Sequence, residues 1–289
     1  KHRAPVTTGW QEIDTITGGG LGKSELGVVI APTGAGKSMA LVHLGAQAIK
    51  EGKTVVHYTL ELQDTIIGTR YDSCITGYPL SDIRSFKEEV YEEITQLDGS
   101  LIVKEYPTKS ASTNTIRSHL SRLIKRDIKP GLIIVDYADL LKPVIIRKEK
   151  RNELESIYEE LRALSTEFQC PIWTASQTNR SGLNAEVITM EQISEAFNKC
   201  FVADFIFSIS RTIEDKQNNQ GKIFIAKNRN GPDGIIYPIF MDTACVKIQI
   251  LPKAQMPTMA SGVATSPVAL GVKQQQELLR QKYTKLKRK

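Results

Sequence analysis

A glycine-rich loop, Ala31-Pro-Thr-Gly-Ala-Gly-Lys-Ser38, lies directly between an apolar run and a helical pattern. Strand, glycine-rich turn and helix in that order are the context that a phosphate-binding loop requires. The glycines let backbone N–H groups converge on phosphate oxygens, the lysine supplies a cation for the β and γ phosphates, and the serine hydroxyl can ligate Mg²⁺. The loop therefore predicts a nucleotide site, and the expected ligands are Thr33, Gly34, Ala35, Gly36, Lys37 and Ser38.

Short β-branched runs alternate with longer amphipathic stretches, which is typical of an α/β fold with a parallel sheet covered by helices on both faces. The expected strands are Leu26–Ala31, Thr54–Leu60, Ser100–Tyr106, Leu132–Asp136, Pro171–Ser176 and Phe205–Ser210. The expected helices are Ser38–Glu51, Asp64–Thr76, Leu80–Leu97, Thr113–Lys125 and Arg151–Phe168. Three later runs lie close together, with Asn-Gly and Asp-Gly pairs between the first two. They predict a C-terminal antiparallel β-meander of Lys222–Ala226, Ile235–Met241 and Val246–Leu251.

The composition predicts one main domain followed by a linker and a tail. A hydrophobic content of 40% can bury a sizeable core, which we place in residues 1–251. Residues 252–272 are rich in Pro, Ala, Ser, Thr and Gly and are expected to form a flexible linker. Residues 273–289 are basic, and apolar residues at helical spacing suggest a short helix, either a solvated tail or a docking or DNA-contacting peptide. The net charge of +6 favours anionic partners such as nucleic acid.

The cysteines and the apolar runs exclude several protein classes. Four cysteines lie far apart, without a CxxC pair or a histidine at ligand spacing, which argues against a zinc site and against a disulfide framework. No apolar run approaches the roughly 18 to 20 residues of a membrane span, and the first residues do not resemble a signal segment. We therefore expect a cytoplasmic protein without a membrane partner.

Polar side chains end three further expected strands, where ligands bind in open α/β sheets. Asp136 follows four apolar residues and is expected to hold Mg²⁺ through water. Glu61 is placed to orient or deprotonate the attacking water, with an acid at a helix start as the alternative. Gln177 can sense the γ-phosphate and pass its presence to the following loop, with a polar strand end of no special role as the alternative. Asp139 is expected to face solvent or a loop.

These blocks resemble the C-terminal motor domain of DnaB-type replicative helicases, particularly phage members. Five segments between residues 7 and 250 carry the resemblance: the Ala31–Ser38 loop with its Ala in first position, Tyr58-Thr-Leu-Glu61-Leu with Arg70 in the next helix, Leu-Ile-Ile-Val-Asp136-Tyr137, Ala175-Ser-Gln177-Thr-Asn-Arg180-Ser, and Ala203-Asp204 through Ile225-Ala-Lys227-Asn-Arg229-Asn230-Gly231-Pro232. The last is the most specific, because its Lys-x-Arg-Asn-Gly-Pro hairpin separates these motors from other RecA-like ATPases. The resemblance implies a RecA-like P-loop core that binds ATP and Mg²⁺, with Arg70 among the nucleotide ligands.

The resemblance also implies roles for cations outside the phosphate loop. Lys227 and Arg229 would reach the nucleotide site of a neighbouring subunit as an arginine finger and its partner, and alternation with Asn228 places both on one side of the strand. The loops Lys142–Arg151 and Asn179–Met190 would line a channel that binds single-stranded DNA, mainly through phosphates because neither contains an aromatic residue. The candidate DNA-binding residues are Arg147, Lys148, Lys150, Arg151, Arg180 and Asn184. From the residues alone, solvated surface charges are the alternative for both sets.

The implied function is that of an ATP-dependent replicative DNA helicase motor. It would translocate 5′-to-3′ on single-stranded DNA as a hexameric ring, in the cytoplasm of a bacterium and encoded by a phage, with a primase and a helicase loader as partners. Two other functions are compatible with the phosphate loop. One is a recombinase-like filament protein, and the other is a ring ATPase that acts as a regulator or loader without translocating. The Lys-x-Arg-Asn-Gly-Pro hairpin favours the helicase.

Overall fold

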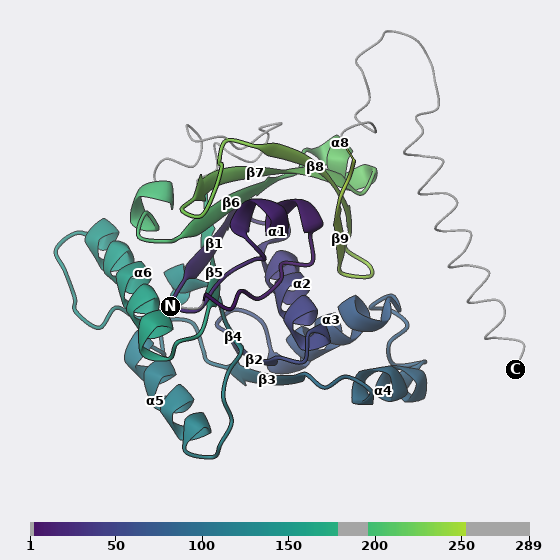
Figure 1. Ribbon diagram of the computed structural model, residues 1–289, viewed down its shortest axis with the longest axis horizontal. Coiled ribbons are helices and arrows are strands. Elements are labelled where there is room, and N and C mark those ends of the chain that lie inside the picture. Colours follow the sequence, from purple (N-terminus) through teal and green to yellow (C-terminus); the bar gives the residue numbers. More distant parts are fainter. Residues whose placement is uncertain (1–2, 179–195, 253–289) are drawn as a thin grey trace, which may run out of the picture. The chain divides into compact units, whose positions relative to one another are not determined.

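One sheet of nine strands, in the order β3-β2-β4-β5-β1-β6-β7-β8-β9, organises the computed structural model, which describes residues 3–178 and 196–252 (Figure 1). The strands are β1 Leu26–Ala31, β2 Thr54–Thr59, β3 Ser100–Glu105, β4 Leu132–Asp136, β5 Ile172–Gln177, β6 Phe205–Ser210, β7 Gln220–Asn228, β8 Ile236–Asp242 and β9 Lys247–Ile250. Strands β1 to β6 pair in parallel, and β6 to β9 pair antiparallel. The expected α/β class and its C-terminal meander are confirmed.

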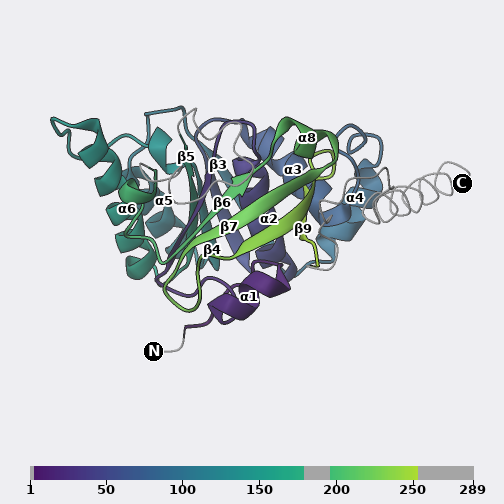
Figure 2. The same ribbon diagram turned by 90° about the horizontal axis from the view of Figure 1, so that it is seen from above.

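Helices cover both faces of the parallel strands (Figure 2). The described helices are α1 Gln11–Thr17, α2 Lys37–Lys50, α3 Asp64–Thr76, α4 Lys87–Thr95, α5 Thr113–Ile124, the 3₁₀ helix η1 Ala138–Leu140, α6 Lys150–Glu167 and α8 Ile213–Gln217. Alternation along β1 explains the two layers: Leu26, Val28 and Ile30 join the core beneath α5 and α6, whereas Val29 and Ala31 join the core beneath α1, α2 and α3. The sheet is thus buried on both sides.

The described helices differ from the expected ones at α4, α1, α8 and η1, and at the first two of these tertiary contacts outweigh the local pattern. The expected helix Leu80–Leu97 begins only at Lys87, since residues 80–86 form turns and the N–H of Leu80 donates to the carbonyl of Ala244 (2.8 Å). Helix α1 was not expected, because its seven residues are too few to show a period. It is tied to the sheet by Trp10, which stacks on His43 at 4.3 Å between ring centroids and donates to the carbonyl of Ile248.

Within the described residues, no helix is both long and apolar enough to cross a bilayer. The chain divides into two units, Lys1–Ile250 and Leu251–Lys289, and the sheet with its helices belongs to the first.

Candidate nucleotide site and neighbouring basic groove

The phosphate loop joins β1 to α2 at the carboxyl edge of the sheet. Ala31 ends β1 in extended conformation, as its position before proline predicts, and pairs with Gln177 of β5. Gly36 caps α2 with a φ of 104°, and a Cβ at this position would lie 2.0 Å from Cε of Met241. The positive φ favours glycine here, and an added Cβ would also displace the flexible end of the Met241 side chain. The open N-terminus of α2 is suited to an anion.

A cavity of about 300 Å³ lies against this loop. Its walls come from the loop, the start of α2, the end of β2, helix α3, the end of β5 and the turn after β8: Thr33, Gly34, Gly36, Lys37, Ser38, Met39, Glu61, Leu62, Arg70, Gln177 and Thr243. Eight of the residues expected at the nucleotide site are among them, and Ala35 is buried in the same loop. Met39 and Leu62 directly follow Ser38 and Glu61 in the sequence, whereas Thr243 carries no sequence signal, because only the folded chain brings it to the loop.

Asp136, at the end of β4, is buried beside this cavity with an exposed fraction of 1%. Burial raises the pKa of Asp136 to about 6, a hydrogen bond from Ser38 opposes the rise, and the Glu61 carboxylate adds to it. Among the described residues, no group donates a hydrogen bond to Oδ1 of Asp136. A buried carboxylate oxygen with an open acceptor position, next to a serine hydroxyl, fits a hydrated Mg²⁺. Ser38 and Asp136 can therefore hold the metal in the expected way.

Two cations face this carboxylate. Burial lowers the pKa of Lys37, against the opposing influence of Asp136 and Glu61, and its Nζ lies 5.4 Å from the centroid of the Tyr137 ring. Burial likewise lowers the pKa of Arg70, again opposed by Asp136 and Glu61. Positive charge is thus held in a partly dry site, where its attraction for phosphate is strongest.

Gln177 touches the phosphate loop directly. Its side-chain Nε2 donates to Oγ1 of Thr33 (2.6 Å), and its Oε1 accepts from the hydroxyl of Tyr137 (3.0 Å). The amide is therefore placed where a change at the loop can alter its hydrogen bonds.

The Asp139 side chain faces helical residues and the end of β5 rather than solvent or a loop, so that expectation is wrong. Its Oδ2 accepts from Nζ of Lys199 (2.6 Å), in an ion pair whose side chains are only 14% and 11% exposed. Its Oδ1 accepts from the hydroxyl of Tyr158 (2.8 Å), and the backbone N–H of Gln177 donates to Oδ2 (3.3 Å). The turn of η1 after β4 carries Asp139 back to the sheet edge, which strand spacing alone does not reveal.

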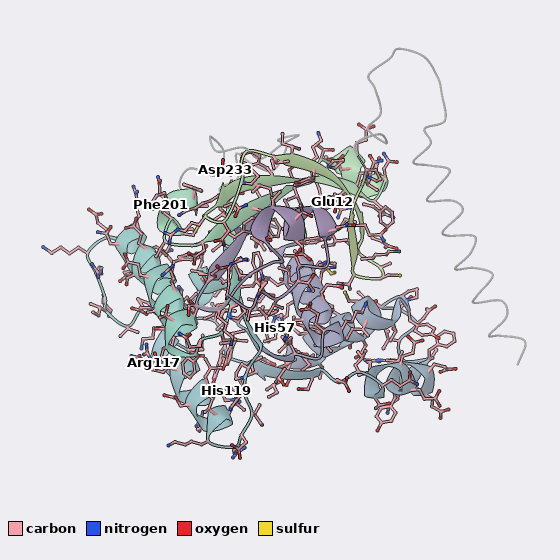
Figure 3. The ribbon with its side chains drawn as sticks, viewed as in Figure 1. Glu12, His57, Arg117, His119, Phe201 and Asp233 are labelled. Carbon is pink, nitrogen blue, oxygen red and sulfur yellow. The ribbon has the colours of Figure 1, made fainter. Side chains whose placement is uncertain are left out.

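The two hairpin cations lie together at the end of β7. Nζ of Lys227 donates to the carbonyl of Phe201 and lies 4.1 Å from the centroid of its ring. Phe201 is labelled in Figure 3. Arg229 forms an ion pair with Asp204 (3.1 Å) and is 44% exposed. Asn228 between them is buried and donates to the carbonyl of Ile16, so the cations share the opposite side of the chain. Both cations contact their own chain here, and their action on a neighbour stays a prediction.

A second cavity, of about 520 Å³, follows the end of β4 and the start of α6. We call it the basic groove; it is lined by Lys109, Lys142, Pro143, Ile146, Arg147, Lys148, Lys150, Glu153, Leu154 and Ile157. The expected loop Lys142–Arg151 ends earlier, because Lys150 and Arg151 form the first turn of α6, and Arg151 is not among the lining residues. Lys109 was not expected, since it comes from the segment before α5. Arg180 and Asn184 lie outside the described residues.

Comparison with known proteins identifies the family. The model described as the DnaB-like helicase C terminal domain matches residues 5–246. The chain belongs to this DnaB-like family. A DnaB-like replicative helicase of Enterobacteria phage T4 is 33% identical over 232 residues, which cover 76% of this chain and 49% of the relative. The chain spans about half the length of the curated relatives that it matches.

Solved structures agree with the fold of this DnaB-like chain. One that is described as an ATPase domain has a TM-score of 0.71 at 20% identity, covering 86% of this chain and 92% of that one. A DnaB-like replicative helicase, described with its interactions with primase, has a TM-score of 0.71 at 19% identity, covering 87% of this chain and 62% of that one. These likenesses confirm the RecA-like core, and the family match confirms the resemblance drawn from five sequence blocks. A recombinase is not favoured.

Proposed function

We propose that this chain is the ATP-driven motor of a replicative DNA helicase, which translocates along single-stranded DNA as a hexameric ring and unwinds duplex DNA. The observation that carries the proposal is the hydrogen bond from Gln177 to Thr33, in a chain of the DnaB-like family. It joins the phosphate loop to the strand whose following segment is expected to bind DNA. DNA binding that depends on the bound nucleotide is a coupling between two sites, and this hydrogen bond lies between them.

In the proposed reaction, the chain's own residues position ATP and water. The phosphate loop and Lys37 bind the β and γ phosphates, and Arg70 adds positive charge from α3. Ser38 and Asp136 hold Mg²⁺, which neutralises charge on the β and γ oxygens when bound. Glu61, on the cavity wall after β2, orients the attacking water and accepts its proton. Gln177 distinguishes the presence of the γ-phosphate from its absence.

The ring supplies the remaining groups. Lys227 and Arg229 leave their contacts with Phe201 and Asp204 and stabilise charge on the γ-phosphate bound to a neighbouring subunit, with Arg229 as the finger. The basic groove binds the phosphates of single-stranded DNA through Arg147, Lys148 and Lys150, joined by Arg151 and, from the following segment, Arg180 and Asn184. Movement is proposed to run 5′-to-3′, as in the resembling family.

The partners follow from the same reading. A primase is proposed because a solved DnaB-like helicase of this fold is described with its interactions with primase. A helicase loader is proposed from the family resemblance. The likeness to a phage T4 protein supports a phage gene product that acts in the bacterial cytoplasm. The main domain, linker and basic tail are proposed to divide at residues 251 and 272.

The test combines assembly with unwinding. Native mass measurement with ATP and single-stranded DNA is expected to give a hexamer, which then separates a forked duplex when ATP is hydrolysed. Lys37→Ala protein serves as the matched control and should leave the fork intact. Strand exchange between homologous duplexes without fork unwinding would instead support a recombinase. ATP turnover that is equal with and without DNA would support a ring that does not translocate.

A further inference from the structure

Residues 137–142 form the turn that connects β4 to the basic groove. Lys109 holds this turn on the side of the groove. Nζ of Lys109 donates to the carbonyls of Asp139 (2.6 Å) and Leu141 (2.8 Å), and its backbone N–H donates to the carbonyl of Leu140 (2.9 Å). Two of the three N–H groups of this ammonium are therefore occupied by carbonyls of one turn. Lys109 also lines the basic groove. The same ammonium thus belongs to the turn and to the surface that is proposed to meet DNA phosphates.

The Asp139 carboxylate holds the turn on the side of β5. This side chain accepts from the backbone N–H of Gln177, from the Lys199 ammonium and from the Tyr158 hydroxyl. Tyr158 is fully buried, and its hydroxyl oxygen also lies 3.2 Å from the carbonyl oxygen of Ala175 in β5. Asp139 therefore ties the turn to the last residues of β5, where Gln177 contacts the phosphate loop.

These contacts form one continuous series across described residues. It runs from Thr33 through the Gln177 side chain, then through the Gln177 backbone to Asp139, and on to Lys109 in the groove wall. The contacts are hydrogen bonds between named groups of adjoining elements, which is the kind of contiguous network that can carry coupling between two sites.

We propose that the turn of residues 137–142, held on its β5 side by the Asp139 carboxylate and on its groove side by Lys109, couples nucleotide binding to the DNA affinity of the basic groove. A DNA phosphate that draws the Lys109 ammonium towards the groove lengthens its hydrogen bonds to the carbonyls of residues 139 and 141, and so weakens the hold on the turn. A nucleotide that shifts Gln177 alters the hydrogen bond from the Gln177 backbone N–H to the Asp139 carboxylate, on the β5 side of the turn. Because coupling between sites is reciprocal, each ligand alters the affinity for the other. Asp139 and Lys109 are positioning residues in this scheme, which rests on the proposed function.

The experiment compares Lys109→Met with a matched variant from the same groove. Lys142→Met, at the last residue of the turn, also removes one cation from the groove wall, but the Lys142 side chain makes no described hydrogen bond within the turn. The 289-residue chain is titrated with a fluorescein-labelled dT oligonucleotide, once with a non-hydrolysable ATP analogue and once with ADP, each with Mg²⁺. For the parent protein the two affinities are expected to differ by about 5-fold or more, the usual lower range of allosteric coupling.

Both lysine variants should bind DNA more weakly in both nucleotide states, since each loses a phosphate contact. Lys142→Met should keep the parental ratio of the two affinities, whereas Lys109→Met should bring the ratio towards one. Asp139→Asn, which removes no groove cation and barely changes volume, should also bring the ratio towards one. Combining it with Lys109→Met should reduce the ratio no further, because the residues act in series.

The coupling role is overturned if Lys109→Met and Lys142→Met keep the same ratio, if folded Asp139→Asn keeps the parental ratio, or if the parent binds DNA equally with both nucleotides. A parent protein that binds no oligonucleotide with either nucleotide refutes the proposed function itself. The two failures are distinct, because each outcome against the coupling leaves a parent that still binds DNA.

Discussion

The nucleotide site and the basic groove both gather cations at the end of the sheet, but they hold them differently. In the nucleotide site Lys37 and Asp136 are buried, at 9% and 1% exposure, and each charge faces an opposite one. In the groove Lys142, Arg147 and Lys148 are exposed. Buried charges interact strongly and their effects are not additive, whereas exposed charges are screened and contribute small, nearly independent amounts. Substitutions in the nucleotide site should therefore abolish ATP hydrolysis, whereas single substitutions in the basic groove should weaken DNA binding by small steps.

The largest effect is expected for Lys37→Ala. Hydrolysis should fall to the background rate, because no other side chain of the phosphate loop carries positive charge to the β and γ phosphates. The fold should survive, since burial already disfavours the ammonium and lowers its pKa. Phosphate release at saturating ATP and a thermal melt of the same sample measure both expectations. Parental turnover in the folded variant would contradict the nucleotide-site assignment.

Substitution of Arg229 tests whether the nucleotide site includes a residue from a neighbouring subunit. It is 44% exposed, like a groove residue, yet it is proposed to act as part of a neighbour's nucleotide site. Arg229→Ala should still bind ATP through its own Lys37 but lose about 10³ to 10⁵ in hydrolysis rate, the range for arginine fingers. Binding of a fluorescent ATP analogue and phosphate release separate the two effects.

Mixing experiments decide whether Arg229 acts in trans. Arg229→Ala and Lys37→Ala proteins are combined in varying ratios after subunit exchange has been confirmed. Partial recovery of hydrolysis is expected, because some interfaces then pair an intact loop with an intact finger. A parental rate for Arg229→Ala alone would reject the finger.

Glu61→Gln separates chemistry from binding within the nucleotide site. ATP affinity should be kept, because the amide preserves shape, while hydrolysis should fall by about 10² or more, as for loss of a general base. Single-turnover hydrolysis and equilibrium binding are the measurements. Loss of binding instead would make Glu61 a structural or metal-holding residue, and the catalytic assignment would fail.

Site residues at the ends of strands could be predicted from the sequence, whereas those in turns could not. Asp136 and Gln177 could be placed from sequence because each ends an apolar strand, and parallel strand ends meet at one edge. Asp139 could not be placed, since its contacts depend on the 3₁₀ turn of η1 and on Lys199, 60 positions away. Thr243 reaches the cavity only because β8 returns beside the phosphate loop. Strand ends can be read locally, whereas turns that return to the sheet cannot.

Acid should destabilise the buried region selectively. His57, on β2 (Figure 3), is fully buried, and burial lowers its pKa to about 3, with Arg70 adding to the shift. The unfolded chain, with a histidine pKa near 6.5, therefore binds more protons, and stability falls as the pH drops from about 6.5 towards 3. At pH 5 the loss is on the order of 2 kcal/mol. His57→Asn should remove this part of the pH dependence in urea unfolding measured at pH 7 and pH 5.

His119→Asn provides the matched control for acid destabilisation. His119 lies half-buried on α5, and its pKa is lowered by partial burial and by Arg122 and Lys104. Solvent screens this histidine, so its removal should change the pH dependence less than removal of His57 does. Equal changes for the two variants would show that burial does not control the acid response.

The smallest effect is expected when single cations of the groove are removed. Its size at neighbouring positions shows which residues contact DNA. Lys148 lines the groove, whereas Arg151 lies on the first turn of α6 and is not among the described lining residues. Each phosphate contact contributes about 0.7 to 0.9 to the slope of log affinity against log salt. Lys148→Met should therefore flatten the slope by nearly one unit, equivalent to about a 3-fold change in relative affinity between roughly 50 and 200 mM salt.

Arg151→Met removes the same charge three positions along the chain and should change the slope less. Titrations of a dT oligonucleotide at four salt concentrations give both slopes. Equal flattening would show that Arg151 contacts DNA as fully as Lys148 does. An unchanged slope for Lys148→Met would place the groove outside the DNA path.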